Sequence, residues 1–236
     1  MSKWGILMDN EKPFLYQLSE WFMRLSVTNI AWFILNLPIV YFLLNIVYAT
    51  SSESRYILAV GIIVLAPFLF FPATTALFAM VRDWILKNEQ GSLIKTYFSH
   101  FRKNYRFSAI GGILLTGIWV VLAIDFLYVK EINVLLLFSI LGLGIVIYIF
   151  TLNFFIVLVH YDEKLTILLK KTFVLTLVSP KLFLIQVLAS AGILYISIGG
   201  WLVLLPFFTG SLIAVISYAA FYRMYLNVLD FKNNPI

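Results

Sequence analysis

Cysteine is absent from this 236-residue chain, and charged residues are scarce. Without a thiol the chain can form no disulfide, no cysteine-ligated zinc site, no thiolate nucleophile and no palmitoylated surface. Asp, Glu, Lys and Arg make up 12% of the residues, about half of the charged fraction that is typical of soluble domains. This composition excludes a disordered protein, a nucleic-acid-binding protein and an ordinary soluble domain.

Short catalytic and nucleotide-binding motifs are also missing. The sequence has no His-Glu-x-x-His, no Gly-x-Ser-x-Gly and no glycine-rich phosphate loop. We therefore expect no enzymatic activity, no cofactor and no direct binding of ATP. The only mixed cluster of metal-ligand types is His160, Asp162 and Glu163, whose spacing matches no metal motif, so we interpret it as a solvated helix end.

Apolar residues dominate what is present: they make up 62% of the chain, and the mean hydropathy is +0.98. A membrane-spanning helix needs roughly 20 mostly apolar residues, so intervals without Lys, Arg, Asp or Glu mark candidate spans. The last such interval, Leu182–Tyr222, is 41 residues long, and we divide it at Gly199-Gly200. The sequence predicts an all-α polytopic membrane protein with six transmembrane helices, over 27–48, 56–80, 107–125, 132–159, 182–198 and 201–222.

The basic residues predict the orientation of these spans. With both termini in the cytoplasm, 15 of the 17 Lys and Arg residues lie inside, and only Arg55 and Lys130 lie outside. Loops rich in Lys and Arg stay on the cytoplasmic side of a membrane. We therefore expect a multi-pass protein of the plasma membrane with both termini cytoplasmic.

Segments that mix charged and apolar residues precede the first, third and fifth spans, and we interpret them as cytoplasmic interfacial helices. The best of them, Ser92–Arg106, is predicted to place Tyr97 and Phe98 on an apolar face and its basic residues opposite. The other two cover Pro13–Leu25 and Leu165–Ser179. Each would lead directly into a helical hairpin.

These units recur at an offset of 76 residues. At this offset Trp21-Phe22 aligns with Tyr97-Phe98, and Lys95-Thr96-Tyr97 aligns with Lys171-Thr172-Phe173. The pattern predicts three parallel helical-hairpin repeats, 1–80, 81–160 and 161–236, within a single membrane domain, 1–236. Membrane hairpins of similar length look periodic even without a repeat, so both interpretations stand.

Two prolines in the second predicted span, Pro67 and Pro72, predict a bend, because proline removes a backbone donor and clashes one turn back. Thr74 and Thr75 follow them and can bond the carbonyls that the bend frees. This segment is either a structural kink or a gate that contacts a ligand.

Two further sets of polar residues are candidates for contacts. Asn36 and Asn153 lie inside predicted spans, where an amide must find a partner on another helix or line a polar cavity. The second set is the cytoplasmic loop before the third span, which can bind anionic lipid or a protein partner through its basic residues. These are Arg82, Lys95, Arg102, Lys103 and Arg106.

Several elements together resemble one family of bacterial membrane proteins. They are Pro72-Ala73-Thr74-Thr75-Ala76-Leu77, Arg82, the run from Phe98 to Tyr105, Asn29-Ile30-Ala31-Trp32, and Leu37-Pro38. With these elements the chain resembles, over nearly its whole length, the YesL-like family of bacterial integral membrane proteins, a domain of unknown function. The resemblance implies a bacterial plasma-membrane location and supplies no catalytic residue.

Members of this family commonly lie beside genes for binding-protein-dependent sugar importers and polysaccharide breakdown. The resemblance thus implies an accessory protein that assists an ABC-type oligosaccharide importer through helix-helix contacts with its permease subunits. The alternative is a stand-alone transporter or channel for a small polar solute, which would place carboxylates or broken helices near the bilayer midplane. Only the helix with Pro67 and Pro72 offers such a feature. The expected partners are the lipid bilayer and the permease, and no nucleic acid.

Overall fold

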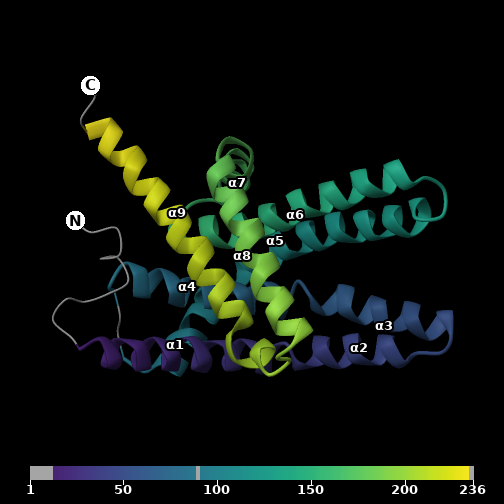
Figure 1. Cartoon of the computed structure of the whole chain (residues 1–236), viewed down its shortest axis with the longest axis horizontal. Helices are drawn as coiled ribbons and strands as arrows, with labels where there is room; N and C mark the ends of the chain where they lie inside the picture. Colours follow the sequence, from purple (N-terminus) through teal and green to yellow (C-terminus); the bar gives the residue numbers. More distant parts are fainter. Residues whose placement is uncertain (1–12, 89–90, 234–236) are drawn as a thin grey trace.

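The computed structural model describes residues 13–88 and 91–233, and all regular elements in these ranges are helices (Figure 1). The predicted all-α class is confirmed. The two chain ends lie outside the described residues. The helices are α1 (Phe14–Leu35), α2 (Leu37–Tyr48), α3 (Ser52–Leu65), α4 (Phe70–Ile85), α5 (Leu93–Val129), α6 (Val134–His160), α7 (Leu165–Val178), α8 (Pro180–Gly199), the π-helical turn η1 (Leu205–Thr209) and α9 (Gly210–Asn233).

Among the described residues, four stretches are single helices long and apolar enough to cross a membrane: α5, α6, α8 and Leu205–Leu229. Two bent helix pairs, α1 with α2 and α3 with α4, pass the same test when each pair is taken together, which gives up to six spans. The structure is therefore that of a multi-pass membrane protein.

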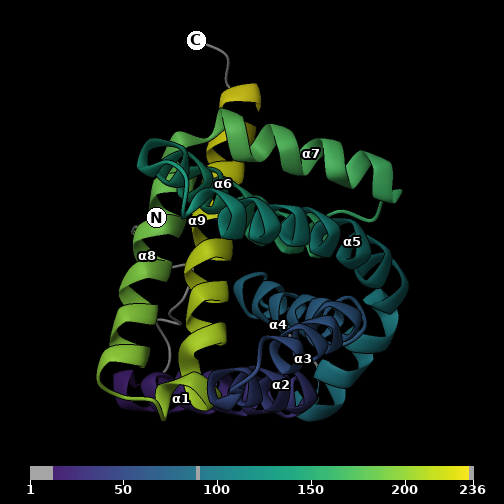
Figure 2. The same cartoon turned by 90° about the vertical axis from the view of Figure 1, so that its right-hand side faces the viewer.

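The hairpins do not all point the same way. The α2–α3 and α5–α6 hairpins extend side by side in one direction in Figure 1, and in Figure 2 both are seen nearly end-on. The α8 and α9 helices cross that direction steeply, and η1 joins them at the far edge. The α8–α9 hairpin therefore runs in a different direction from the other two, and outside this hairpin α9 packs mainly on α4 and α1.

The first predicted span, 27–48, is not one helix, and the separate interfacial helix expected before it does not end at Leu25. Instead α1 runs continuously to Leu35, and the chain bends by 67° at Asn36 before α2. Pro38 is in the first turn of α2, where its missing N–H breaks the hydrogen-bond ladder but is tolerated as a helix start.

The predicted bend of the second span lies at residues 66–69, between α3 and α4, and measures 45°. Pro67 is in this turn. Pro72 is in the first turn of α4, a position where backbone N–H groups have no intrahelical partner. The two prolines therefore end one helix and start the next, which explains why the break precedes Pro72.

The interfacial helix predicted over 92–106 and the span over 107–125 form one helix of 37 residues, so the predicted boundary between them is wrong. No Gly or Pro lies between Ser92 and Gly111, so nothing interrupts the backbone where the composition changes. The third unit differs, because Pro180 separates α7 from α8 close to the predicted position. The last helix begins later and ends later than the predicted 201–222.

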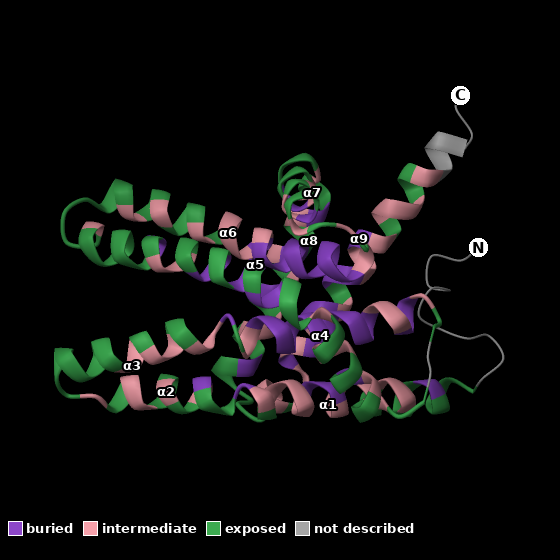
Figure 3. Ribbon diagram, turned by 180° about the vertical axis from the view of Figure 1, so that it is seen from behind, coloured by how far each residue is buried: buried purple, intermediate pink, exposed green. Residues whose placement is uncertain are grey.

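The core forms around α4, of whose 16 residues 13 are buried. Figure 3 shows the buried residues gathered where α4 meets α5, α6 and α9, while the outer halves of the α2–α3 and α5–α6 hairpins are largely exposed. Aromatic rings fill the centre: Phe155 of α6 stacks on Phe78 of α4 with ring centroids 5.5 Å apart. The exposed hairpin surfaces are apolar, as expected for helices that face lipid.

Candidate functional site

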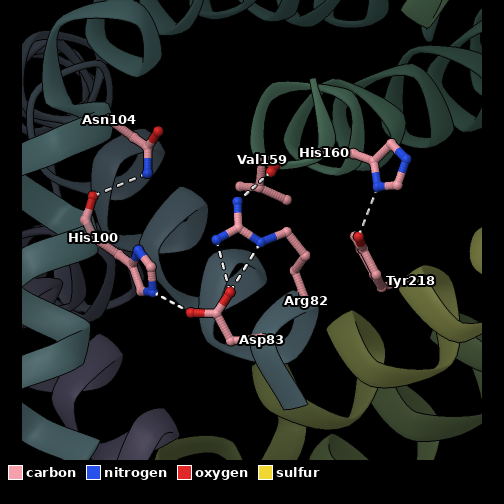
Figure 4. Close-up of polar contacts among 7 residues, drawn as sticks. All are labelled: Arg82, Asp83, His100, Asn104, Val159, His160 and Tyr218. Atoms are coloured by element: carbon pink, nitrogen blue, oxygen red, sulfur yellow. Dashed lines mark hydrogen bonds and ion pairs between the residues drawn. The ribbon is translucent and has the colours of Figure 1, made fainter. Parts of the chain in front are cut away.

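The polar junction joins α4, α5, α6 and α9 at one end of the core, through the side chains shown in Figure 4. Arg82, near the end of α4, donates through Nη1 to the Val159 carbonyl of α6 at 2.5 Å. Its Nε and Nη2 donate to Oδ1 of Asp83 at 3.0 and 2.7 Å. One guanidinium thus satisfies both a backbone carbonyl on another helix and its neighbouring carboxylate.

Asp83 continues the polar junction toward α5. Its second oxygen, Oδ2, lies 2.7 Å from Nε2 of His100, and both side chains are 13% exposed. Asn104, one turn further along α5, donates to the His100 carbonyl at 3.1 Å. The carboxylate therefore accepts from two helices, which restrains the orientation of α5 relative to α4.

His160 links the end of α6 to α9, because its Nδ1 and the Tyr218 hydroxyl are 2.9 Å apart. The His160 ring is surrounded by the rings of Tyr161, Phe221 and Tyr225, with centroids 4.7 to 5.0 Å away. The expectation of a solvated helix end is wrong for this histidine. Within the described part of the chain, no three His, Cys, Asp or Glu residues are grouped so that they could hold a metal.

The chemistry of the polar junction is that of a structural link. Each nitrogen of the Arg82 guanidinium has an oxygen partner, and both oxygens of Asp83 accept hydrogen bonds. Ion pairs that are partly buried and hydrogen-bonded on all sides restrain helix positions, and removing one partner leaves an uncompensated charge. The polar junction therefore holds four helices in register.

Outside the helices, Tyr161 follows the end of α6 and packs its ring on the Lys171 ammonium, 3.8 Å from the ring centroid. Lys171 also donates to Glu163 at 3.0 Å. Burial, with smaller contributions from Tyr225 and Glu163, raises the pKa of Tyr161 above its ordinary value. The phenol thus stays neutral near pH 7, and its ring face can accept the cation.

The residues predicted as a kink or gate are buried contacts between helices. Thr74 donates to the Phe70 carbonyl at 2.7 Å and accepts from Nε1 of Trp32 on α1 at 3.0 Å. The hydroxyl of Thr75 lies 2.7 Å from that of Ser108 on α5. The structure thus connects α4 to α1 and α5 through the two threonines.

The two predicted buried amides differ in their surroundings. Asn153 donates to Thr176 of α7 at 3.0 Å and accepts from Gln186 of α8 at 2.9 Å, so it joins three helices. Asn36 donates to the Trp32 carbonyl of its own helix at 2.8 Å. At the break between α1 and α2, the Trp32 carbonyl therefore accepts from both the backbone N–H and the side chain of Asn36.

The five basic residues proposed for lipid or partner contact divide into two groups. Arg82 turns inward to the polar junction, as described above. The other four are exposed along α5, together with some of the aromatic residues that were expected on the opposite face. Tyr97 is fully buried, whereas Phe98 is 40% exposed, so the predicted apolar face of Ser92–Arg106 is split between core and surface.

Asn29 is the residue that sequence reasoning missed. It is fully buried in α1, donates to the Leu205 carbonyl at 2.9 Å, and accepts from the Ser211 amide at 2.8 Å. Leu205 is the first residue of η1 and Ser211 follows its end, so Asn29 spans the point where the helical ladder changes from π to α. An amide inside an apolar run was the available signal, but its partners lie 176 and 182 residues away in the sequence.

Comparisons with known proteins agree with the predicted resemblance. A family model described as "Protein of unknown function, DUF624" matches residues 25–126. "Uncharacterized protein YesL" of Bacillus subtilis (strain 168) is 26% identical over 220 residues, covering 89% of this chain and 90% of that protein. The YesL-like family resemblance is confirmed. "Uncharacterized protein YteU" of the same organism is 25% identical to this chain over 229 residues, covering 94% of the chain and 89% of that protein. No solved structure matches.

The stretch that the family model matches contains four of the seven residues of the polar junction. Arg82, Asp83 and His100 lie within residues 25–126, as do Asn29 and the two threonines of α4. His160 and Tyr218 lie beyond it. The similarities to YesL and YteU cover 89% and 94% of the chain, so they extend beyond this matched stretch.

Proposed function

We propose that this YesL-like chain is an integral membrane accessory protein that assists an ABC-type oligosaccharide importer by packing against its permease subunits. The observation that carries the proposal is the distribution of polar and apolar side chains. Polar groups of the membrane helices hydrogen-bond to one another across helix interfaces, whereas the hairpins that project from the core present apolar surface. Such a molecule is organised to contact other membrane components through its outer faces.

The α5–α6 hairpin offers a defined face for such a partner. A Cβ added at Gly117 of α5 or at Gly142 of α6 would meet no heavy atom within 4 Å. Small residues on open helix faces allow a second helix to approach closely in a membrane. We place the permease contact on this hairpin, which extends away from the core beside α2–α3.

Copurification tests this proposal. The full-length chain is extracted in mild detergent, and the proteins that remain bound are identified by mass spectrometry. We expect a sugar-importer permease, and we expect Gly117→Trp and Gly142→Trp to reduce its recovery at least fivefold, because the bulky ring occupies the contact face. Gly192→Trp is the matched control, since a Cβ at Gly192 of α8 is also unobstructed.

The alternative, a stand-alone transporter or channel, makes a different prediction in the same preparation. A chain that purifies without a permease and conducts a small polar solute in liposomes would overturn the accessory role. In that case Pro67, Pro72, Thr74 and Thr75 are the first candidates for a gate. A flux unchanged in Thr74→Val/Thr75→Val would in turn remove them from that role.

We further propose that the membrane topology has six spans, with each bent helix pair crossing once and both termini in the cytoplasm of a bacterial plasma membrane. The chain has no native cysteine, so single cysteine substitutions report accessibility cleanly. Cysteines at Ser52 and Lys130 should react with an impermeant reagent in intact cells, and cysteines at Ser92 and Lys170 should not. External labelling at Ser92 would overturn this topology.

The proposed three-unit repeat has support from the hydrogen bonds between helices. The first unit is linked to the second, the second to the third, and the third back to the first. These bonds are Thr75 to Ser108, Asn153 to Thr176, and Asn29 to Ser211. A closed ring of three units accounts for this pattern, and separate stability of a fragment such as 1–80 would argue against it.

A further inference from the structure

An open groove of about 410 Å³ runs between α7 and the second half of α9. Its walls are mainly apolar: Val174, Leu175 and Val178 come from α7, and Phe221, Met224 and Val228 come from α9. The floor is formed by the end of α6. Most of the exposed lining is apolar, which disfavours a sugar and favours a hydrocarbon chain.

Two lysines line the same groove but differ in their partners. Lys171 is compensated by Glu163, at 3.0 Å, and by the ring of Tyr161. Lys170 is exposed, and no other described residue forms an ion pair with it. The groove therefore combines an apolar wall with one uncompensated ammonium group, which is complementary to an amphiphile with an anionic head.

The outer surface of α7 indicates where such an amphiphile comes from. Phe173 and Leu177, which do not line the groove, are 57% and 58% exposed, so this helix presents apolar residues outside the groove as well as inside it. A helix that combines exposed apolar residues with lysines is typical of helices that lie in the membrane interface. The groove beside α7 is thus open to lipid rather than to bulk water alone.

We propose that the groove between α7 and α9 binds an anionic phospholipid, with one acyl chain along Val174, Val178 and Met224 and the phosphate on Lys170. Lys171 lines the same groove, but Glu163 compensates its charge, so the proposal assigns recognition of the phosphate to Lys170 alone. The proposal is independent of the permease contact, because it concerns a different face of the molecule.

The test is native mass spectrometry of the full-length protein in detergent micelles doped with either phosphatidylglycerol or phosphatidylcholine. The wild type should retain one phosphatidylglycerol in preference to phosphatidylcholine. Lys170→Gln should weaken phosphatidylglycerol binding about fivefold, which corresponds to about 1 kcal/mol for one basic residue near an anionic surface. Lys95→Gln is the control, since Lys95 on α5 is also exposed and lies far from the groove in sequence.

The acyl-chain half of the proposal is tested by filling the groove. Val174→Trp and Val178→Trp should each abolish the retained lipid, and both positions are exposed enough to accept a larger ring without disturbing the core. A monodisperse elution profile identifies the variants that fold. Equal retention of both lipids, equal effects of Lys170→Gln and Lys95→Gln, or unchanged lipid in both folded tryptophan variants would overturn the proposal. A wild-type dimer that the tryptophans dissociate would identify a second copy as the occupant instead.

Discussion

Gly111 of α5 faces the ring of Phe154 on α6, and we predict that Gly111→Ala destabilises the fold. A Cβ built at Gly111 comes 2.2 Å from Cζ and 2.8 Å from Cε2 of Phe154, whereas packed carbon atoms lie about 3.5–4.0 Å apart. The ring must therefore move by more than about 1 Å. Phe154 is fully buried, and the ring of Phe155 lies 5.8 Å away, so the ring cannot move into solvent without disturbing its neighbours.

Two opposing effects set the size of the change in the free energy of unfolding. Overpacking a filled core costs about 1–3 kcal/mol, and the severe overlap at Gly111 places this substitution at the upper end. Alanine is favoured over glycine in a helix interior by about 1 kcal/mol. We therefore expect the free energy of unfolding to fall by about 2 kcal/mol.

Gly117, on the same helix, is the matched control, because a Cβ there meets nothing within 4 Å. Gly117→Ala should leave the free energy of unfolding unchanged or raise it by up to about 1 kcal/mol. The assay is unfolding by SDS titration in mixed micelles, followed by circular dichroism. Phe154→Leu should partly rescue Gly111→Ala in a double-mutant cycle. If Gly111→Ala is as stable as Gly117→Ala, the described packing of α5 on α6 is refuted.

The same titration checks three further predictions. Asn29→Ala should cost about 2–3 kcal/mol, because a buried N–H and a carbonyl lose their partner, and Asn45→Ala, whose amide bonds its own helix, should cost less than about 1 kcal/mol. Asn153→Leu and Gln186→Leu should each cost about 1–3 kcal/mol, and the double variant less than their sum; strict additivity would mean that they do not interact. Asp83→Asn should cost about 1–2 kcal/mol, and a value near zero would contradict the polar junction.

Helix positions were predictable wherever charge or proline marks them. Charge marks the tip between α5 and α6, at Lys130 and Glu131, because it acts locally on the contact of the chain with lipid. Proline marks the start of α8, at Pro180, because it acts locally on the backbone. The continuity of α5 was not predictable from composition, since a change from basic to apolar residues does not interrupt a hydrogen-bond ladder. The break at Asn36 was missed because the Leu37-Pro38 pair lies inside a charge-free run.

Contacts across the bundle depend on distance in space, which spacing along the chain does not reveal. The sequence marked Asn153 as an amide that needs partners, but it did not identify Thr176 and Gln186. It suggested a solvated His160, because three charged or polar residues follow one another there. The ring environment that overturns this interpretation comes from α9, whose Tyr218 lies 58 residues further along the chain.

The hydrogen bonds of Asn29 with Leu205 and Ser211 can form only late in the synthesis of the protein. Ser211, whose backbone N–H donates to Asn29, follows it by 182 residues, which a ribosome working at about 5–20 residues per second needs roughly 9–36 s to add. Throughout that interval α1 is already in or near the membrane, and the side-chain amide of Asn29 has neither of its two backbone partners. The N-terminal helix can therefore take its final position only when the last hairpin has left the ribosome, and assembly is completed by the end of the chain closing on its beginning.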